Sequence, residues 1–420
     1  MRVLWFSTNC SLYEPVKIKK GGGYNGGGWM SSVQNEIMKR EDITLAVSFC
    51  MNGQPERVVQ DGVCYYPVPH HTKRLKDKVL DIIHYKDATR DEVLWQHYIG
   101  HFKHVIEDFK PDVIEVFGSE LYLGLSALAA KQLGIPCCLH LQGLLSLSLY
   151  IYLIPGVSRR SYIFSKGWRR AYGMFQLLTY WQRSCHREKA ILRAVPHVLG
   201  RTDWDRQAVA VLNPEARYHF GGEILRPCFY LPSTRCLPPT LTITTTISAA
   251  PYKGLDLILK IARIMKEEMQ LDFVWNCFGN VDTSFAENLT GIRHEDVNVR
   301  LCGVASAEEL RDALLRSTLY CHTSYVENSP NSVAEAQMLS LPVVATNVGG
   351  TSSMVAHGET GFLFPATDPY IAAYHIMRLA TDKELNVRMG EDAQAIAMAR
   401  HDKQKIVSSL IETYMSIMGK

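Results

Sequence analysis

The sequence predicts an α/β protein of two Rossmann-like domains, each formed by a parallel β-sheet with helices on both faces. Three observations lead to this prediction. At 420 residues the chain is longer than one hydrophobic core usually supports. Short apolar segments alternate with helical ones, the order that produces parallel sheets. The alternation stops between Pro227 and Pro239 and then starts again, so this stretch is expected to link the two domains.

In the first half, apolar runs of four or five residues predict strands, and longer periodic segments predict helices. Pro111 and Pro136 each precede a strand at a point where a helix must already have ended. The expected strands are Val3–Phe6, Leu45–Phe49, Val113–Phe117 and Cys137–Leu141. The expected helices are Trp29–Arg40, Glu92–Phe109 and Leu121–Leu133.

The second half repeats the pattern and ends in a helix expected from about His401 to Met418, where apolar residues recur at helix-face spacing. In open α/β sheets ligands bind beyond the carboxyl ends of the strands, so two such halves predict a site in a cleft between them. The expected strands are Leu241–Ile247, Phe273–Phe278, Val299–Leu301, Leu319–His322 and Pro342–Thr346. The expected helices are Gly254–Met269, Ala307–Ser317, Asn331–Ser340 and Asp368–Ala380.

Composition excludes several classes of protein. The net charge of +3 gives no reason to expect a nucleic-acid partner. Eleven scattered cysteines without a Cys-x-x-Cys pair are typical of reduced thiols in a cytoplasmic enzyme. The segment from Met1 to Phe6 is too short for a signal-peptide core and is expected to form a strand. The longest apolar region, Leu139–Ile154, is interrupted by polar residues, which argues against a membrane span.

The segment from Glu327 to Glu335 carries the clearest chemical signal, because it follows a predicted strand and opens a predicted helix. Ser329 is expected to be the N-cap and Pro330 the first helical residue. The first-turn N–H groups and the helix dipole then favour a bound phosphate. Glu327 is placed to accept hydrogen bonds from sugar hydroxyls, and Glu335 to hold two ribose hydroxyls. The alternative is a capped helix with two solvated acids.

Glu327-x7-Glu335, followed by Leu341–Gly350 and by Gly358-x-x-Gly361-Phe362-Leu363, resembles the group 1 retaining glycosyltransferases of GT-B fold (family 4), of the kind that build capsules and exopolysaccharides. The resemblance implies transfer of a sugar, with retention, from a nucleoside-diphosphate sugar to a hydroxyl of a saccharide or lipid-linked saccharide. It implies an acceptor domain over residues 1–230 and a donor domain over residues 231–400. A final helix, about 401–420, is expected to cross back to the first domain.

The same resemblance assigns roles to single residues. Glu327 is expected to bind the donor sugar and Glu335 the ribose. The remaining expected donor contacts are Gly27, Gly28, Arg201, Gly279, Ser329, Asn331, Ser332, Gly349 and Gly350. Many relatives carry an acid after the paired glycines, whereas this chain has Ser353, and Arg226 matches a position common in polysaccharide-building relatives.

Lys253 is the expected phosphate ligand, since a lysine at a strand-to-helix turn neutralises diphosphate oxygens as a point charge. The family pairs such a lysine with an arginine five or six residues upstream, but these positions are Ser248 and Ile247 here. Helix N–H groups are expected to supply part of the missing charge. The alternative for Lys253 is a solvated turn lysine.

Three features of the first half depart from the family or remain open. The glycine run from Gly21 to Gly28 is expected to contact the donor diphosphate through Gly27 and Gly28, or else to be a mobile loop. The family places a histidine where this chain has Gln142, so either Gln142 contacts the donor sugar or His140 has a structural role. Arg201 either approaches the phosphates or forms an ion pair that packs the domain.

No metal site and no cofactor are expected, and the Asp-x-Asp triplet Asp203-Trp204-Asp205 is interpreted as structural. Between Arg159 and Arg193, nine cations and interleaved aromatic residues face a single acid, Glu188. This composition predicts docking on the anionic inner face of a membrane, with a solvated packing helix as the alternative. A sugar-nucleotide epimerase of the same fold and an inactive sugar-nucleotide-binding protein are the other functions the sequence permits.

Overall fold

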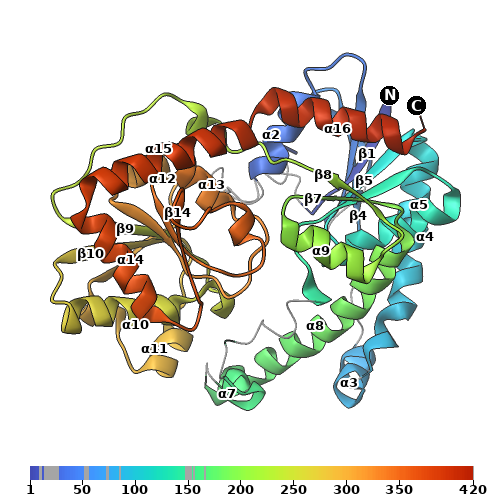
Figure 1. Ribbon diagram of the computed structural model, residues 1–420. Helices are drawn as coiled ribbons and strands as arrows, with labels where there is room; N and C mark the ends of the chain where they lie inside the picture. The colour runs from blue at the N-terminus through green and yellow to red at the C-terminus, as the bar shows by residue number, and fades with distance from the viewer. Residues whose placement is uncertain are drawn as a thin grey trace. The chain divides into compact units, whose positions relative to one another are not determined.

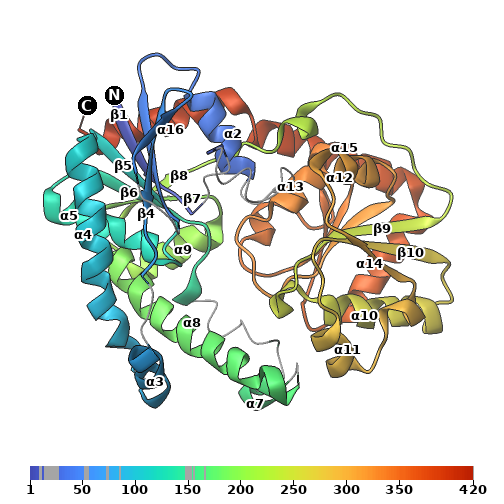
Figure 2. The same ribbon diagram turned by 180° about the vertical axis from the view of Figure 1, so that it is seen from behind.

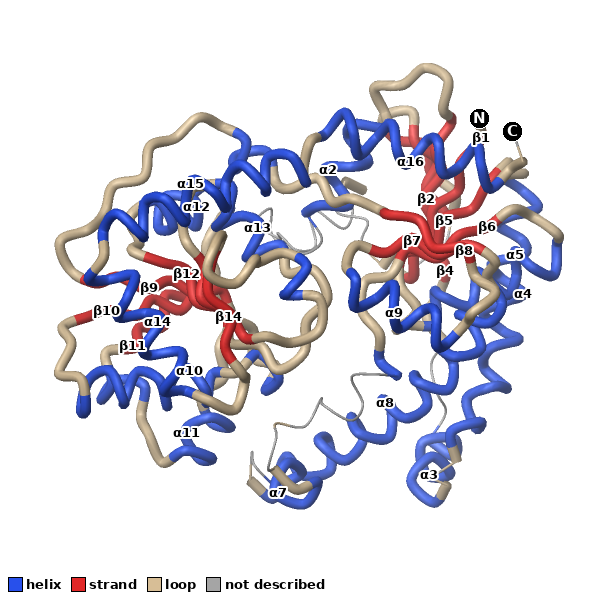
Figure 3. The backbone as a smooth tube through the Cα atoms, viewed as in Figure 1, coloured by secondary structure: helices blue, strands red, loops and turns tan. Residues whose placement is uncertain are grey.

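A computed structural model describes residues 1–8, 12–13, 28–51, 56–71, 75–84, 87–146, 154, 157–164 and 167–419. The chain forms two compact units. Unit 1 comprises residues 1–149, 176–224 and 402–420, and unit 2 comprises residues 150–175 and 225–401. Each unit contains one sheet with helices on both faces (Figure 1, Figure 3), which confirms the predicted α/β class. The sequence did not predict that residues 150–175 group with unit 2.

The sheet of unit 1 has eight strands within the described residues, in the order β3-β4-β2-β1-β5-β6-β7-β8. Neighbouring strands are parallel except β3 and β4, which form an antiparallel pair at one edge. Its strands are β1 (Arg2–Phe6), β2 (Thr44–Cys50), β3 (Val58–Gln60), β4 (Val63–Val68), β5 (Val113–Phe117), β6 (Cys137–His140), β7 (His197–Gly200) and β8 (Arg217–Phe220).

Helices lie on both faces of this sheet (Figure 2). Alternate side chains of its strands point to opposite faces and so enter different helix layers. Leu4 and Phe6 pack with α4 (Glu92–Phe109), α5 (Ser126–Leu133) and α9 (Asp203–Leu212). Trp5 points to the other face, where its indole N–H donates to Tyr414 of α16 (Lys403–Ile417). The helix α2 (Gly28–Ile37) lies beside α16. A further helix of this unit is α3 (Leu75–Ile83).

The helix α8 (Trp168–Ala194) belongs to both units, since residues up to Phe175 group with unit 2 and the rest with unit 1. The short helix α7 (Arg159–Phe164) precedes it. Tyr162 of α7 is fully buried and packs its ring against Phe285 of unit 2, with the centroids 5.9 Å apart. Every helix in the described part of the chain is too short or too polar to span a bilayer.

The sheet of unit 2 is entirely parallel, in the order β11-β10-β9-β12-β13-β14. One face packs on α12, α13 and α15, and the other on α10 and α14 (Figure 1). Its strands are β9 (Leu241–Thr246), β10 (Phe273–Phe278), β11 (Val299–Gly303), β12 (Leu319–His322), β13 (Val343–Thr346) and β14 (Gly361–Phe364). Its further helices are α10 (Leu255–Arg263, continued by one π turn), α11 (Ser284–Thr290), α12 (Ala307–Leu315), α13 (Asn331–Met338), α14 (Pro369–Thr381) and α15 (Lys383–Arg400).

Candidate active site

The strand order of unit 2 reverses between β9 and β12, and the loops after these two strands carry Lys253 and Glu327. Ligands of open parallel sheets bind at such a reversal, beyond the carboxyl ends of the strands. Gly254 brings the two loops together, because its φ of 78° suits glycine and a Cβ there would overlap the carbonyl oxygen of Thr323. The fold therefore places the two predicted residues at the edge where a ligand is expected.

Lys253 and Glu327 form an ion pair, with Nζ 2.7 Å from Oε2 of the carboxylate. The Nε2 atom of His322, the last residue of β12, lies 3.2 Å from the same oxygen. Burial alone would raise the pKa of the Glu327 carboxyl, but the charge of Lys253 and the ring of His322 outweigh it and hold that pKa well below its usual range. Glu327 is consequently an ionised hydrogen-bond acceptor at neutral pH.

The loop that carries Glu327 is fixed from behind by the paired glycines. A Cβ on Gly349, whose φ is 52°, would overlap the carbonyl oxygen of Glu327. The N–H of Gly350 donates to that same oxygen at 3.2 Å. Gly279 makes a similar close approach behind the β9 loop, where its Cβ would overlap the carbonyl oxygen of Ile247. In this structure the glycines thus hold the backbone of the two loops in place.

The helix α13 begins at Asn331, as in the predicted range Asn331–Ser340, but its cap differs from the prediction. Pro330 is the N-cap and Asn331 the first helical residue, and no side chain caps the helix. The prediction that Ser329 is the N-cap is therefore wrong. The reason is that the carbonyl of Pro330 accepts the first helical hydrogen bonds, from Val333 and Ala334, while its ψ of 110° is extended. The Oδ1 atom of Asn331 is buried without a hydrogen-bond partner at this helix end.

Glu335, on the second turn of α13, is already engaged by an arginine. The Nε and Nη2 atoms of Arg226 donate to Oε1 and Oε2 of Glu335, both at 2.7 Å. The Arg226 and Glu335 side chains are only 16% and 6% exposed. Burial raises the pKa of the Glu335 carboxyl, and the charge and hydrogen bonds of Arg226 oppose that rise. Sequence spacing could not reveal this pair, because 109 residues separate its members.

In unit 1, His140 belongs to a buried polar network. Its Nδ1 lies 2.7 Å from Oε1 of Glu115, whose other oxygen accepts the hydroxyl of Tyr414. Tyr414 in turn accepts the indole N–H of Trp5 at 2.9 Å. Burial lowers the pKa of His140, although Glu115 opposes the shift. These contacts support the structural alternative for His140 and leave Gln142, beyond the end of β6, as the candidate for a donor contact.

Glu120 lies beyond the carboxyl ends of the unit 1 strands, as Gln142 does. The sequence interpretation missed it. It follows β5, next to the reversal of strand order at β1 and β5, and its carboxylate lies against the backbone of Gly118 and Gly143. Burial raises the pKa of Glu120 to about 7, and the charge of Glu188 adds to the rise. The position of Glu120 three residues after a predicted strand was the available signal.

Arg201 is also bound by several side-chain and backbone partners within unit 1. Its guanidinium forms an ion pair with Glu223, donates to the carbonyl of Leu141 and stacks over Trp29 at 5.1 Å. Burial lowers the pKa of Arg201 to about 10. These contacts support the domain-packing alternative. The donor contacts predicted nearby are Gly28, which opens α2, and Gly27, which lies outside the described residues.

The triplet from Asp203 to Asp205 has a structural role, as interpreted. Thr202 is the N-cap of α9, and Asp205 completes the capping box by accepting the N–H groups of Arg201 and Thr202. Asp203 pairs with Arg206 at 2.9 Å. In the described part of the chain, no three His, Cys, Asp or Glu side chains are grouped so that they could hold a metal ion. His97 and His101 lie one helical turn apart on α4, with ring centroids 4.6 Å apart, but they do not belong to such a group of three.

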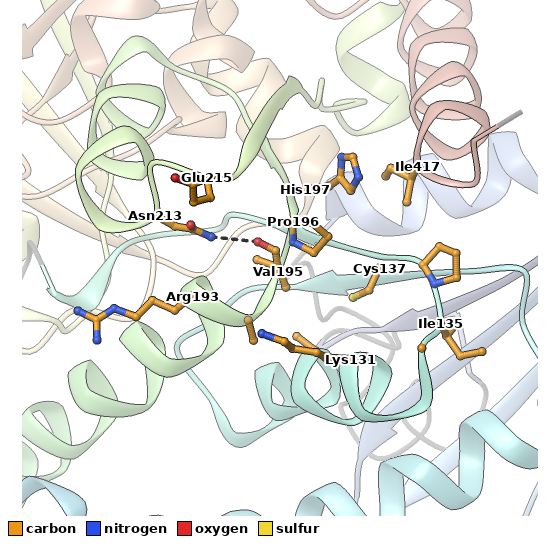
Figure 4. Close-up of a pocket in the computed structure, with 14 residues that line it drawn as sticks. Lys131, Ile135, Cys137, Arg193, Val195, Pro196, His197, Asn213, Glu215 and Ile417 are labelled. Atoms are coloured by element: carbon orange, nitrogen blue, oxygen red, sulfur yellow. Dashed lines mark hydrogen bonds between the residues drawn. The ribbon is translucent and has the colours of Figure 1, made fainter.

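A pocket of about 470 Å³ lies at the amino ends of strands β6 and β7 in the unit 1 sheet (Figure 4). Cys137 and His197, the first residues of β6 and β7, line it, as do Lys131 and Arg193 near helix carboxyl ends. Asn213 points to the carbonyl of Val195 and donates to it at 3.0 Å. Because ligands bind at the carboxyl ends of parallel strands, this pocket is not the candidate active site.

Comparison with known proteins identifies the class first. The UDP complex of HepE (Alr3699) from Anabaena superposes on 99% of this chain and 100% of its own, with a TM-score of 0.65 and 16% sequence identity. Sucrose-phosphate synthase from Thermosynechococcus elongatus superposes on 100% of this chain and 99% of its own, also with a TM-score of 0.65, at 14% identity. The fold is that of the GT-B glycosyltransferases, as the resemblance implied.

Unit 2 contains the match to a family model. Residues 241–396 match the sequence profile of the family described as glycosyl transferases group 1, so the chain contains a domain of that family. D-inositol 3-phosphate glycosyltransferase of Corynebacterium efficiens is 32% identical over 149 residues, which are 34% of this chain and 35% of that protein. The chain thus spans about a third of the length of this curated relative. The proteins to which these comparisons relate the chain are glycosyltransferases.

Proposed function

We propose that this protein transfers a glycosyl group from a nucleoside-diphosphate sugar to a hydroxyl of a saccharide or lipid-linked saccharide, with retention of configuration. The observation that carries the proposal is the Lys253–Glu327 pair at the reversal of strand order in a group 1 glycosyltransferase domain. The buried cation and the ionised carboxylate meet where the helix α13 begins. One ligand with a diphosphate and a hydroxylated sugar matches both charges.

In this proposal the ion pair between Lys253 and Glu327 opens when the donor binds. Lys253 turns its ammonium to the diphosphate oxygens, and the first-turn N–H groups of α13 add partial positive charge. Glu327 then accepts hydrogen bonds from sugar hydroxyls. Stabilisation of the leaving diphosphate by these groups, without a metal ion, would supply most of the rate enhancement.

The donor is identified by a thermal-shift screen with UDP-, GDP-, ADP- and CDP-sugars, since a ligand that binds only the folded state raises Tm. Transfer is then measured as acceptor-dependent release of the nucleoside diphosphate, with and without a chelator. Glu327→Gln should lower transfer by at least 100-fold while it changes nucleotide binding little. The exposed Glu359→Gln is the matched control. Full transfer by Glu327→Gln, or loss of transfer with the chelator, would count against the proposed mechanism.

We also propose a role at the membrane for the exposed tip of α7 and α8. Phe164, Trp168 and Tyr172 are 53%, 76% and 51% exposed. Exposed cations accompany them at Arg159, Arg160, Arg169 and Arg170. Such a surface suits anionic lipid, with about 1 kcal/mol for each cation near it. The predicted surface is smaller than residues 159–193, because Arg183 and Arg187 are buried and engaged by Asp81 and by the carbonyl of Glu120.

Liposome flotation tests this role. The wild type should float with vesicles that contain phosphatidylserine at low salt, and the double variant Arg160→Glu, Arg169→Glu should not. Lys383→Glu with Arg388→Glu, an equal charge change at two exposed positions of α15, is the control. If both double variants float like the wild type, this surface does not bind lipid and the enzyme meets its acceptor in another way.

A further inference from the structure

Arg226 lies outside the family motif but is fixed beside it. It is the N-cap of a short 3-10 helix, Pro227–Tyr230, at the point where the chain enters unit 2. Its guanidinium stacks over the ring of Phe229, 5.0 Å from the centroid, and Phe229 is buried in the core that includes Val333 of α13. The hydroxyl of Tyr230 holds the turn by donating to the carbonyl of His401 at 2.8 Å. The arginine therefore reaches α13 from a rigid support.

The two parallel hydrogen bonds from Arg226 leave two of the four lone-pair positions of the Glu335 carboxylate without a partner. An ionised carboxylate has about four lone-pair positions, and two parallel N–H···O bonds occupy one on each oxygen. One position remains on each oxygen, and the planar guanidinium fixes the direction in which both point. These two positions point away from each other, so a ribose hydroxyl can donate to one of them but the adjacent 2′ and 3′ hydroxyls cannot fill both.

We propose that Arg226 is a positioning residue for the nucleotide, which aligns Glu335 so that one of its remaining lone pairs accepts the 2′ hydroxyl of the ribose. This inference rests on the proposed function, in which Glu335 contacts ribose. Arg226 also keeps Glu335 ionised, because burial works against the charge of that carboxyl and Arg226 opposes the effect. A protonated carboxyl would lose one acceptor position and present an O–H group instead.

The opposite effect of the same ion pair is an autoinhibitory contact, in which Arg226 competes with ribose for Glu335. The two ideas predict opposite signs. If Arg226 positions Glu335, its removal weakens binding of ribonucleotides and reduces the preference for ribose over deoxyribose. If Arg226 competes, its removal strengthens binding of ribonucleotides. One set of affinities therefore decides between them.

The experiment is calorimetric titration of the full chain with a nucleoside diphosphate, whichever of UDP, GDP, ADP and CDP binds the wild type most tightly, and with its 2′-deoxy analogue. Hydrogen bonds to a charged group contribute about 1.5–3 kcal/mol each, so the wild type should prefer the ribonucleotide at least about tenfold. In Arg226→Gln we expect that preference to fall to about threefold or less, while the Kd for the deoxy analogue changes little.

Two further variants separate positioning from folding. Arg226→Lys keeps the positive charge but loses the planar fork, so it should bind diphosphate and still lose most of the ribose preference. Arg235→Gln is the matched control, because Arg235 belongs to the same linker and contacts Thr318 and Asn386 instead of Glu335. It should keep the wild-type preference. In Arg226→Gln the remaining preference for ribose over deoxyribose should grow with pH, because the pKa of Glu335 rises when Arg226 is removed and the carboxyl ionises only at higher pH.

The outcomes distinguish this inference from the proposed function. If the wild type shows no ribose preference, or Glu335→Gln keeps that preference, the ribose contact itself is absent and the inference fails with it. If Glu335→Gln loses the preference but Arg226→Gln and Arg226→Lys both keep it, the ribose contact stands and the positioning role is overturned. Tighter binding of the ribonucleotide by Arg226→Gln would also overturn it, in favour of competition.

Discussion

At the level of single residues, the candidate site depends on contacts between distant segments, which a local sequence pattern does not predict. Glu327 and Lys253 were predicted from their place between a strand and a helix, because strand-to-helix loops of parallel sheets lie where ligands bind, and Glu335 was predicted from its place on the helix that follows Glu327. The partners Arg226 and His322 were not assigned to them, since an ion pair between distant segments depends on the tertiary fold. The sequence thus predicts which residues carry the chemistry, and the structure shows what restrains them.

Lys253 permits a direct test of phosphate recognition. Lys253→Met should weaken binding of the preferred nucleoside diphosphate by about tenfold or more and leave binding of the corresponding nucleoside unchanged, because only the diphosphate needs the charge. Lys266→Met is the control, since Lys266 donates to the exposed carbonyl of Asp296 on another surface. Equal losses for nucleoside and diphosphate would show that the variant disturbs the site as a whole.

Glu120 leads to a prediction about pH. Its folded-state pKa of about 7 lies above the ordinary glutamate value of about 4.3, so the folded state binds the proton more tightly than the unfolded state does. The resulting stability is fully present below about pH 4.3 and is lost as the pH rises through 7. Glu120→Gln should therefore remove a loss of about 1–3 kcal/mol between these pH values. Urea unfolding from pH 4 to 8 measures it, with the exposed Glu107→Gln as control.

At the scale of elements, agreement between prediction and structure differs between strands, since β4, β7 and β14 are largely buried but were not predicted. The runs Phe273–Phe278 and Leu319–His322 were predicted without error, because both are apolar and bounded by polar turns. The helix α8 was predicted only as the alternative for residues 159–193, since its buried face carries Arg183, Arg187 and Glu188 where periodicity requires apolar residues. Polar residues buried by mutual contacts resemble a solvated surface in the sequence.

The glycine that supports the Glu327 loop can be tested against a glycine with a similar backbone but free space. Gly349→Ala forces both a positive φ and an overlap with Glu327, whereas Gly358→Ala, at a φ of 86°, meets nothing within 4 Å. Both should incur a cost of about 1–2 kcal/mol for the left-handed backbone, and Gly349→Ala about 1–3 kcal/mol more for the overlap. Only Gly349→Ala should weaken donor binding, as calorimetry would show. Equal effects would mean that the loop does not depend on this contact.

Across the whole molecule, the last helix shows how residues from the two ends of the sequence meet in the core of unit 1. The helix α16 is the final segment of the sequence, yet it supplies Tyr414 to a network whose other members, Trp5, Glu115 and His140, lie on β1, β5 and β6. The helical periodicity of residues 401–418 predicted the element and the family resemblance its return. Neither could predict that its hydroxyl satisfies a buried carboxylate, because that contact joins residues 299 positions apart.

Tyr414→Phe removes that hydroxyl with little change in volume. Glu115 then loses a donor and Trp5 an acceptor, so we expect unit 1 to lose about 1–3 kcal/mol for each group left unsatisfied. Hydrogen exchange followed by mass spectrometry should show faster exchange in β1, β5 and β6 and unchanged exchange in β9 to β14. Tyr370→Phe in unit 2 is the control, because its hydroxyl contacts the exposed Glu268. Uniformly faster exchange in both sheets would mean instead that the network stabilises the chain as one cooperative body.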